Sequence, residues 1–184
     1  MGEAALPSAA TRTSPNILVT GTPGCGKTTF CQLLSAACSL KQLVVGDLVK
    51  EKGLHEGWDA EWEAYTLDED KLLDEMEDML ADGGTVVEYH SCDFFPERWF
   101  DLVVVLRTEN SILYDRLQKR GYSQKKIEEN LQAEIFGVVA EEAQKSYDAN
   151  IVVELQSNAL SDMQSNVDRA AQWAQQWLRD RAKA

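Results

Sequence analysis

A short glycine-rich segment near the start of the chain carries the clearest chemistry in the sequence. Residues 21–28 read Gly-Thr-Pro-Gly-Cys-Gly-Lys-Thr and match the pattern G-x-x-x-x-G-K-[ST] at every position. Glycines at these places let the backbone turn its N–H groups inward around phosphate oxygens, and the helix predicted to follow adds the positive end of its dipole. An apolar strand pattern precedes the segment, as this loop requires. We therefore predict a site for a nucleoside triphosphate with Mg²⁺.

The side chains of this loop have separate expected roles. Lys27 would reach the β- and γ-phosphates, the Thr28 hydroxyl would ligate Mg²⁺, and Thr29 would contact the α-phosphate. Cys25 is either a small residue that fills space in the loop or, near a helix N-terminus, a reactive thiol. The predicted nucleotide-binding residues are Gly24, Cys25, Gly26, Lys27, Thr28 and Thr29.

Two further candidates follow the apolar run Thr85–Tyr89. Glu88 lies at the end of this predicted strand and His90 directly after it. Because ligands of parallel α/β sheets bind at the carboxyl ends of the strands, both side chains are expected to face the triphosphate. Glu88 would hold Mg²⁺, through water or directly, and His90 would position a nucleophile or act as a general base. A purely structural role is the alternative for His90.

Five basic residues occur within eleven positions, with no acidic residue between them: Arg116, Lys119, Arg120, Lys125 and Lys126. We favour a lid formed by this basic run, in which arginines neutralise charge that develops during phosphoryl transfer. The alternative is a helix C-terminus with favourable cations. Upstream, Asp47 and Lys50 would face a second substrate, although Asp47 would equally suit a helix cap.

Alternating strands and helices would position these groups. Apolar runs predict five strands, at 16–20, 43–45, 85–89, 102–106 and 151–155. Helical patterns separate them, including 27–38 and one long helix over about 123–147. This alternation predicts βαβ units and therefore a doubly wound α/β domain with a parallel sheet. The segment 48–65 fits no strand of that sheet and is expected to form a small helical insertion.

Composition narrows the classes of protein further. The 184 residues carry a net charge of −13, and thirteen acidic residues against two lysines lie between Glu51 and Asp82. Strong direct binding of nucleic acid by this acidic chain alone is not expected. No run approaches the roughly 20 apolar residues of a membrane helix, and the four cysteines lack metal-ligand spacing. Residues 1–14 are expected to be a flexible extension, and 15–184 a single domain.

Seven segments together resemble the adenylate kinase isoenzyme 6 family: 21–29, 45–48, 89–90, 92–100, 105–108, 120–122 and 134–136. The most specific of them reads Cys-Asp-Phe-Phe-Pro-Glu-Arg-Trp-Phe. The resemblance extends from about Pro15 to the terminal helix that carries Trp173 and Trp177. It implies a P-loop kinase fold in which residues 44–67 bind a nucleoside monophosphate through Asp47 and Lys50, and a lid over 119–129 contacts ATP through Arg120.

The same resemblance implies several functions. It implies conversion of ATP and AMP to two ADP, activity on other nucleoside monophosphates, and hydrolysis of ATP. It also implies a role in maturation of the small ribosomal subunit, with a small-subunit ribosomal protein and the pre-ribosome as partners. No membrane is expected to be involved. The nucleus, and also the cytoplasm, are the expected locations.

Two positions depart from the family pattern. Glu88 stands where the family usually has Asp, which would disturb a direct Mg²⁺ contact more than a water-mediated one. Lys50 stands where Arg is common, which predicts weaker binding of the monophosphate because a point charge lacks the bidentate geometry of Arg. Two functions stay open: a nucleoside-monophosphate kinase, or an ATP-dependent assembly switch with incidental kinase activity. A kinase of another small hydroxyl compound fits the phosphate loop but not residues 92–100.

Overall fold

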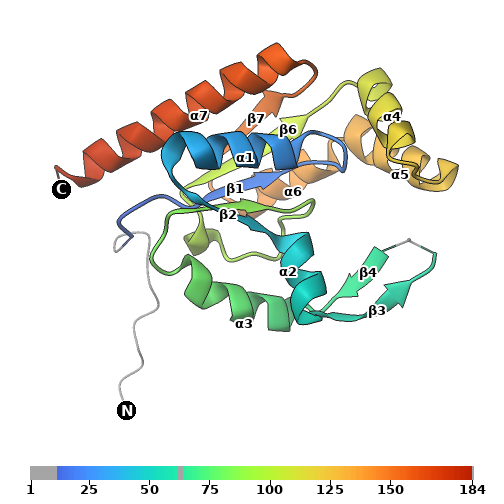
Figure 1. The fold of residues 1–184 in the computed structure, drawn as a ribbon, viewed down its shortest axis with the longest axis horizontal. Helices are drawn as coiled ribbons and strands as arrows, with labels where there is room; N and C mark the ends of the chain where they lie inside the picture. The colour runs from blue at the N-terminus through green and yellow to red at the C-terminus, as the bar shows by residue number, and fades with distance from the viewer. Residues whose placement is uncertain (1–11, 62–63, 184) are drawn as a thin grey trace.

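Five parallel strands form the central sheet of the protein (Figure 1). The structure is a computed structural model that describes residues 12–61 and 64–183. Across the sheet the strands are β2 (Lys41–Val44), β5 (Thr85–Glu88), β1 (Ile17–Thr20), β6 (Leu102–Arg107) and β7 (Val152–Gln156). Each pairs with its neighbour in parallel. The predicted five-stranded parallel sheet is therefore confirmed.

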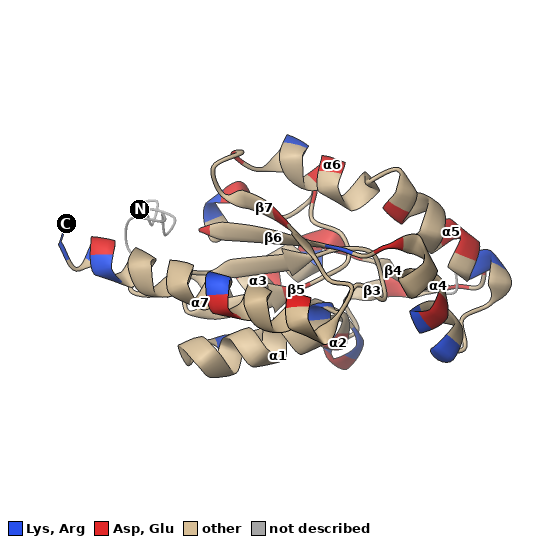
Figure 2. Ribbon diagram, turned by 90° about the horizontal axis from the view of Figure 1, so that it is seen from above, with Lys and Arg blue, Asp and Glu red and all other residues tan. Residues whose placement is uncertain are grey.

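The central strands β5, β1 and β6 are buried along almost their whole length because helices cover both faces of the sheet. Side chains alternate along a strand, so in β1 Leu18 faces one hydrophobic cluster while Ile17 and Val19 face the other. One cluster is covered by α1 (Lys27–Cys38), α4 (Asn110–Lys119), α5 (Gln124–Ile135) and α7 (Leu160–Arg181). The other is covered by α2 (Val45–Lys52), α3 (Glu69–Leu80) and α6 (Val138–Ser146). Figures 1 and 2 show this layered, doubly wound arrangement, in which α1 and α7 lie in contact.

The long helix predicted over 123–147 is two helices. α5 ends at Ile135 and α6 begins at Val138. Gly137 between them has φ 64°, in the left-handed region, and its Cα faces the Arg107 guanidinium, which a Cβ would approach to 3.6 Å. A glycine is favoured in this conformation because it has no Cβ to clash. The turn brings the end of α5 to the carboxyl end of β6.

The insertion after β2 is only partly helical, so the predicted helical insertion is corrected. α2 is followed by an antiparallel hairpin of β3 (His55–Asp59) and β4 (Ala64–Leu67). Trp58 and Tyr65 are direct cross-strand partners, and their rings meet edge to face with centroids 5.2 Å apart. Cross-strand aromatic pairs stabilise a hairpin, and this pairing outweighs any helical preference of the acidic sequence around it.

Residues 12–14 belong to the fold and not to a flexible extension. Arg12 is 4% exposed and pairs with Asp101, with 2.9 Å between Nη2 and Oδ1. Ser14 forms a parallel bridge with Gly83. A buried ion pair fixes this part of the chain, which composition alone could not reveal. The rest of the predicted extension, residues 1–11, lies outside the described residues.

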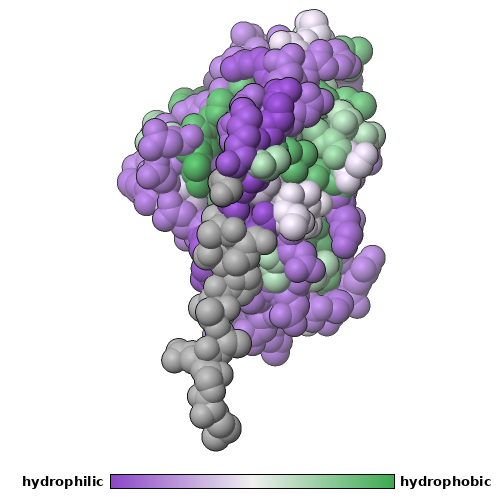
Figure 3. All heavy atoms as spheres, turned by 90° about the vertical axis from the view of Figure 1, so that its left-hand side faces the viewer, coloured by the Kyte–Doolittle hydropathy of each residue, from purple (hydrophilic) through white to green (hydrophobic). Residues whose placement is uncertain are grey.

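The face of the molecule drawn in Figure 3 is largely hydrophilic. Hydrophobic side chains lie on it in separate groups among the hydrophilic ones. Within residues 12–61 and 64–183, no helix has both the length and the apolar character to cross a bilayer.

The four cysteines are all free thiols: Cys25, Cys31 and Cys92 are buried, and Cys38 is half-buried.

Candidate active site

A cavity of about 620 Å³ opens at the carboxyl ends of the strands. Its walls come from the phosphate loop, the end of β5, the insertion and the connection between α4 and α5. This is the position at which parallel α/β sheets bind ligands. Lys27, Glu88, His90, Lys50 and Arg120 all line it, although they are far apart in the sequence.

The phosphate loop ends at Gly26, which has φ 89° and directly precedes α1. The first turn of α1 carries no acidic side chain, so no residue of the helix itself offsets the positive end of its dipole. Thr28 and Thr29 in this turn are exposed. The side chain of Cys25 is instead fully buried, and burial raises the pKa of its thiol. Of the two alternatives for Cys25, the space-filling residue fits this environment and the reactive thiolate does not.

Lys27 is 9% exposed and lies under the arch of the loop. Its Nζ donates to the carbonyl oxygens of Gly21, at 2.6 Å, and Thr22, at 3.1 Å. Burial lowers the pKa of Lys27, whereas the nearby carboxylate of Glu88 acts in the opposite direction. The ammonium group therefore stands at the floor of the cavity, tethered by main-chain oxygens that also shape the loop.

Thr28 and Glu88 form a pair of hard oxygen donors. The Thr28 hydroxyl donates to Glu88 Oε1 at 2.6 Å, and Gln42 Nε2 donates to Glu88 Oε2 at 3.5 Å. Mg²⁺ prefers carboxylate, hydroxyl and water oxygens together with substrate phosphates. The donor set fits Mg²⁺, and Thr28 and Glu88 are the residues that would hold it.

His90 follows β5 and lines the cavity beside Tyr89, with 4.3 Å between the two ring centroids. His90 is exposed to solvent in the cavity that it lines. Partial desolvation, together with the positive charges of Lys27 and Lys126, lowers the pKa of His90 to about 4. The imidazole is therefore neutral near pH 7, a state in which it can accept a proton or a hydrogen bond.

The five basic residues between Arg116 and Lys126 have different surroundings. Arg120 lines the cavity at the end of α4, and its charge contributes to lowering the pKa of Lys27. Arg116 is turned into the fold, where it donates to the carbonyl oxygens of Gly24, at 3.2 Å, and Ser157, at 2.9 Å. Arg116, on α4, therefore holds the main chain of the phosphate loop in place. Figure 2 shows the basic residues around the connection between α4 and α5 at one end of the molecule.

An ion pair also joins the start of α5, which follows the link from α4, to the insertion. Lys125 near the start of α5 lies 3.7 Å from the carboxylate of Glu61 at the end of the hairpin and 4.0 Å from Glu129. Lys126 stands over the ring of Tyr122, 4.7 Å from its centroid. The basic and acidic segments recognised in the sequence thus meet between the start of α5 and the hairpin.

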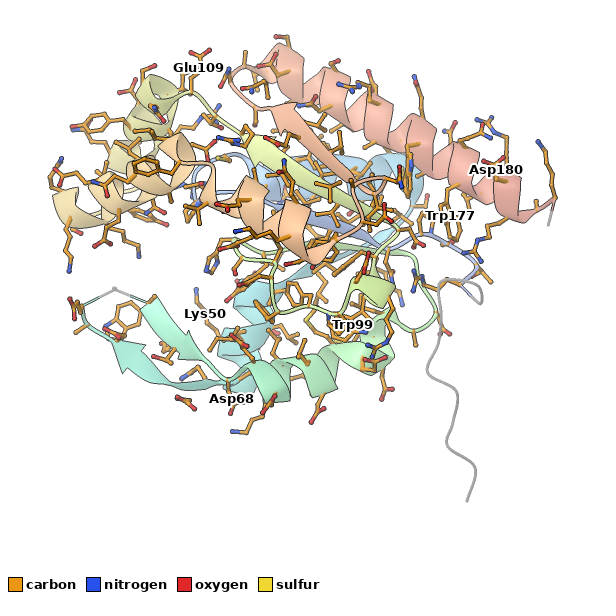
Figure 4. The ribbon with its side chains drawn as sticks, turned by 180° about the vertical axis from the view of Figure 1, so that it is seen from behind. Lys50, Asp68, Trp99, Glu109, Trp177 and Asp180 are labelled. Carbon is orange, nitrogen blue, oxygen red and sulfur yellow. The ribbon has the colours of Figure 1, made fainter. Side chains whose placement is uncertain are left out.

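The two residues predicted for the second substrate are separated. Lys50 lines the cavity from α2, and in Figure 4 it lies between the hairpin and the body of the domain. Asp47 is exposed in the first turn of α2 and is not among the described residues that line the cavity. The alternative role, a helix cap, is not observed either, because the N-cap of α2 is Val44; Asp47 lies within the first turn, where a carboxylate favours the helix dipole.

An aromatic wall was missed by the sequence reasoning. Five rings line the cavity: Trp58, Tyr65, Tyr89, Phe94 and Tyr122. Trp58 remains 57% exposed, which is unusual for so large an apolar side chain. Aromatic faces of this kind can stack on a planar base. The alternation of Trp58 and Tyr65 with polar neighbours could have indicated a hairpin, but nothing local indicated that the hairpin faces the phosphate loop.

Comparison with known proteins is consistent with this geometry. A protein-family model described as "AAA domain" matches residues 17–137. The fold is shared with a shikimate kinase from Bacteroides thetaiotaomicron (TM-score 0.59, 14% identity, 86% of this chain and 97% of that one). It is also shared with a gluconokinase from Sinorhizobium meliloti (TM-score 0.55, 16% identity, 88% and 95%). The fold and the loop define a P-loop kinase.

Sequence relatives give the family. A protein from Dictyostelium discoideum named "Adenylate kinase isoenzyme 6 homolog" is 51% identical over 90% of this chain and 95% of its own length. Proteins with the same name are 47% identical in Schizosaccharomyces pombe, over 92% and 97%, and 50% identical in Caenorhabditis elegans, over 89% and 91%. The chain belongs to the adenylate kinase isoenzyme 6 family, a family of nucleotide kinases, as the sequence resemblance predicted.

Proposed function

We propose that this protein is a nucleoside-monophosphate kinase that transfers the γ-phosphoryl group of ATP to AMP and produces two molecules of ADP. One observation carries the proposal: a single cavity joins a phosphate loop to a second wall of Lys50 and aromatic rings. A triphosphate on the loop would point its γ-phosphate toward that second wall. An acceptor with a planar base and a phosphate matches the aromatic rings and the cation.

The residues of the cavity have distinct roles in the proposed transfer. The bond between the γ-phosphorus and the β–γ bridging oxygen breaks, and a bond forms from the γ-phosphorus to a phosphate oxygen of AMP. Mg²⁺, held through Thr28 and Glu88, would supply charge neutralisation on the β- and γ-phosphates. Lys27 would orient the transferred group from below, and Arg120 would stabilise charge on its equatorial oxygens from the lid.

Hydrolysis of ATP is a second proposed activity. His90 supports it, because a neutral imidazole in the same cavity can orient a water molecule toward the γ-phosphate. With a monophosphate in place, the acceptor phosphate would occupy the position of that water. Transfer would then replace hydrolysis, and the activity on other nucleoside monophosphates would depend on how tolerant the aromatic wall is of the base.

A role in maturation of the small ribosomal subunit is also proposed, by resemblance to the family. Its support in this chain is electrostatic: most of the acidic residues that the structure describes between Glu51 and Asp82 lie on α2, the hairpin and α3. Such a surface would attract a basic partner, as a small-subunit ribosomal protein is, and would disfavour RNA alone. The nucleus, and also the cytoplasm, are the proposed locations. Retention of a small-subunit ribosomal protein with and without ATP tests the partner.

A product assay separates the two enzymatic functions. The protein is incubated with ATP and Mg²⁺, alone and with AMP, CMP or dCMP, and ADP and inorganic phosphate are measured. ADP that forms only with a monophosphate, without free phosphate, supports the kinase. Equal release of phosphate with and without an acceptor overturns it in favour of an ATP-driven switch. A Lys27→Met variant, which removes the ammonium group and keeps much of the side-chain volume, is expected to be inactive in every arm.

A further inference from the structure

Glu134 near the end of α5 is a buried carboxylate behind the phosphate loop. It is 4% exposed and is not among the described residues that line the cavity. Its Oε2 accepts a 2.6 Å hydrogen bond from the hydroxyl of Thr22, inside the loop. Its Oε1 accepts from Arg107 Nε at 2.8 Å and from the main-chain N–H of Thr108 at 3.0 Å. The carboxylate therefore joins the loop to the carboxyl end of β6.

The charge of Glu134 is compensated where it lies. Arg107 contributes Nε to the carboxylate and Nη2 to the main-chain oxygen of Glu134, the latter at 2.9 Å. The remaining nitrogen, Nη1, pairs with Glu154 on β7 at 2.9 Å. A buried carboxylate is tolerated only when hydrogen bonds and an opposite charge replace its hydration. The carboxylate is thus held in one position by donors that follow β1, from Thr22, and by donors at the end of β6, from Arg107 and Thr108.

Thr22 connects this buried group to the reactive side of the loop. Its hydroxyl is held by Glu134, while its carbonyl oxygen accepts from Lys27 Nζ and from the N–H of Cys25, both at 3.1 Å. A movement of Thr22 would therefore move an oxygen that tethers Lys27 and one that shapes the turn before α1. The loop glycines supply no side chains that could fix this arc themselves.

We propose that Glu134 is a positioning residue for the phosphate loop. Through Thr22 it holds the outer arc of the loop in the conformation in which Lys27 and the inward N–H groups can bind a triphosphate. This inference rests on the proposed function and deepens it, because it assigns the preorganisation of the ATP half of the cavity to a residue that does not contact the nucleotide. Glu134 should therefore affect the affinity for the triphosphate and not the affinity for the monophosphate.

Thr22→Val is the sharpest test, because it removes the hydroxyl, keeps the side-chain shape and leaves the pair of Arg107 and Glu134 in place. We expect Kd for MgATP, measured by titration calorimetry, to rise about tenfold or more, the usual effect of losing a hydrogen bond to a charged group. KM for ATP should rise with it, whereas KM for AMP should remain near the wild-type value. Thr22→Ser keeps the hydroxyl and should restore MgATP binding.

Glu134→Gln and Glu154→Gln form a matched pair. Both remove a carboxylate that accepts from Arg107, but only Glu134 touches the loop. We expect Glu134→Gln to weaken MgATP binding as Thr22→Val does, and Glu154→Gln to leave it unchanged. Thermal unfolding of every variant identifies general destabilisation, and Thr22→Val remains informative if Glu134→Gln fails to fold.

The outcomes distinguish this inference from the function on which it rests. A folded Thr22→Val protein with wild-type affinity for MgATP overturns the positioning role. Weakening of AMP and MgATP binding by the same factor also overturns it, because that pattern indicates general loss of structure. If the wild-type protein phosphorylates no monophosphate but Thr22→Val still loses MgATP binding, the proposed kinase function fails and the role of Glu134 stands.

Discussion

The hydroxyl of Thr28 donates a 2.6 Å hydrogen bond to Glu88 Oε1, joining the first turn of α1 to the last residue of β5. The two residues meet because β5 inserts between β2 and β1 in the sheet, with Val19 of β1 in register with Glu88. Strand order thus brings a carboxylate to the hydroxyl that the phosphate-loop pattern supplies. The pair is the oxygen donor set that we assign to Mg²⁺.

Glu88→Gln is expected to raise the Mg²⁺ concentration needed for half-maximal turnover by about tenfold or more, because an amide lacks the charge that binds the cation. The measurement is turnover at saturating ATP over a range of Mg²⁺ concentrations. Glu88→Asp, which shortens the side chain by one methylene, separates a direct from a water-mediated contact: it should be milder if water intervenes. A Mg²⁺ dependence of Glu88→Gln identical to that of the wild type would remove Glu88 from the metal site.

Arg120→Ala should lower kcat by about a hundredfold while changing the affinity for ATP much less, because the guanidinium is assigned to charge that develops in the transition state. Lys119→Ala is the matched control. It removes a neighbouring exposed cation that is not among the described residues lining the cavity, and it should leave kcat nearly unchanged. Equal losses in the two variants would point to general electrostatic attraction of the nucleotide and not to a lid arginine.

His90 should titrate with a pKa of about 4 in the free protein, well below its usual 6.5. The chain has two histidines, so ring signals in an NMR titration can be assigned with a His55→Gln variant. Between about pH 4 and 6.5 the unfolded chain binds more protons at this group, so its contribution favours folding above pH 6.5 and is lost as the pH falls. Bound MgATP brings negative charge and should raise the pKa. A free-protein pKa near 6.5 would contradict the assigned environment.

Lys50 and Asp47 make a second discriminating pair. Lys50→Ala should raise KM for AMP about tenfold, because it removes the cation that faces the proposed acceptor phosphate. Lys50→Arg should lower KM for AMP, since a guanidinium can bind phosphate with two parallel hydrogen bonds. Asp47→Ala should have little effect on KM, because Asp47 stands at the start of α2 outside the cavity lining. A large increase in KM for Asp47→Ala would return it to the substrate site.

Local patterns predicted the elements of this fold well, because the decisive signals were short in range. The phosphate loop lies within eight residues, and the buried strands consist of continuous β-branched and aliphatic runs. The same reasoning joined α5 and α6 into one helix, since a single Gly137 in a helical pattern does not show whether its φ is positive. It also made the insertion entirely helical, because the pairing of Trp58 with Tyr65 depends on a turn and not on periodicity.

Sequence motifs indicated several residues that the structure places at the cavity, but they did not indicate a residue that acts through another residue. Arg116 and Arg120 are four positions apart and look equivalent in sequence, yet one anchors Gly24 from inside the fold and the other lines the cavity. Glu134 lies in one of the segments that resemble the family, but no local feature of its helical pattern shows that this glutamate is buried. Its burial arises only when α5 turns back toward β6, which is a consequence of tertiary packing.

Stability near the N-terminal end of the domain should depend on the pair of Arg12 and Asp101. Asp101 is buried and accepts from Arg12 Nη2 at 2.9 Å and from the main-chain N–H of Asn16 at 2.9 Å. Arg12→Ala leaves this carboxylate buried without its cation, so we expect the free energy of unfolding to fall by about 3–5 kcal/mol. Arg98→Ala breaks the solvent-exposed pair with Glu77 and should cost only about 0–1 kcal/mol. Urea denaturation measures the free energy of unfolding of both variants. If both lose a similarly small amount, Asp101 recovers its solvation once Arg12 is gone. Residues 12–14 would then not be an essential part of the domain.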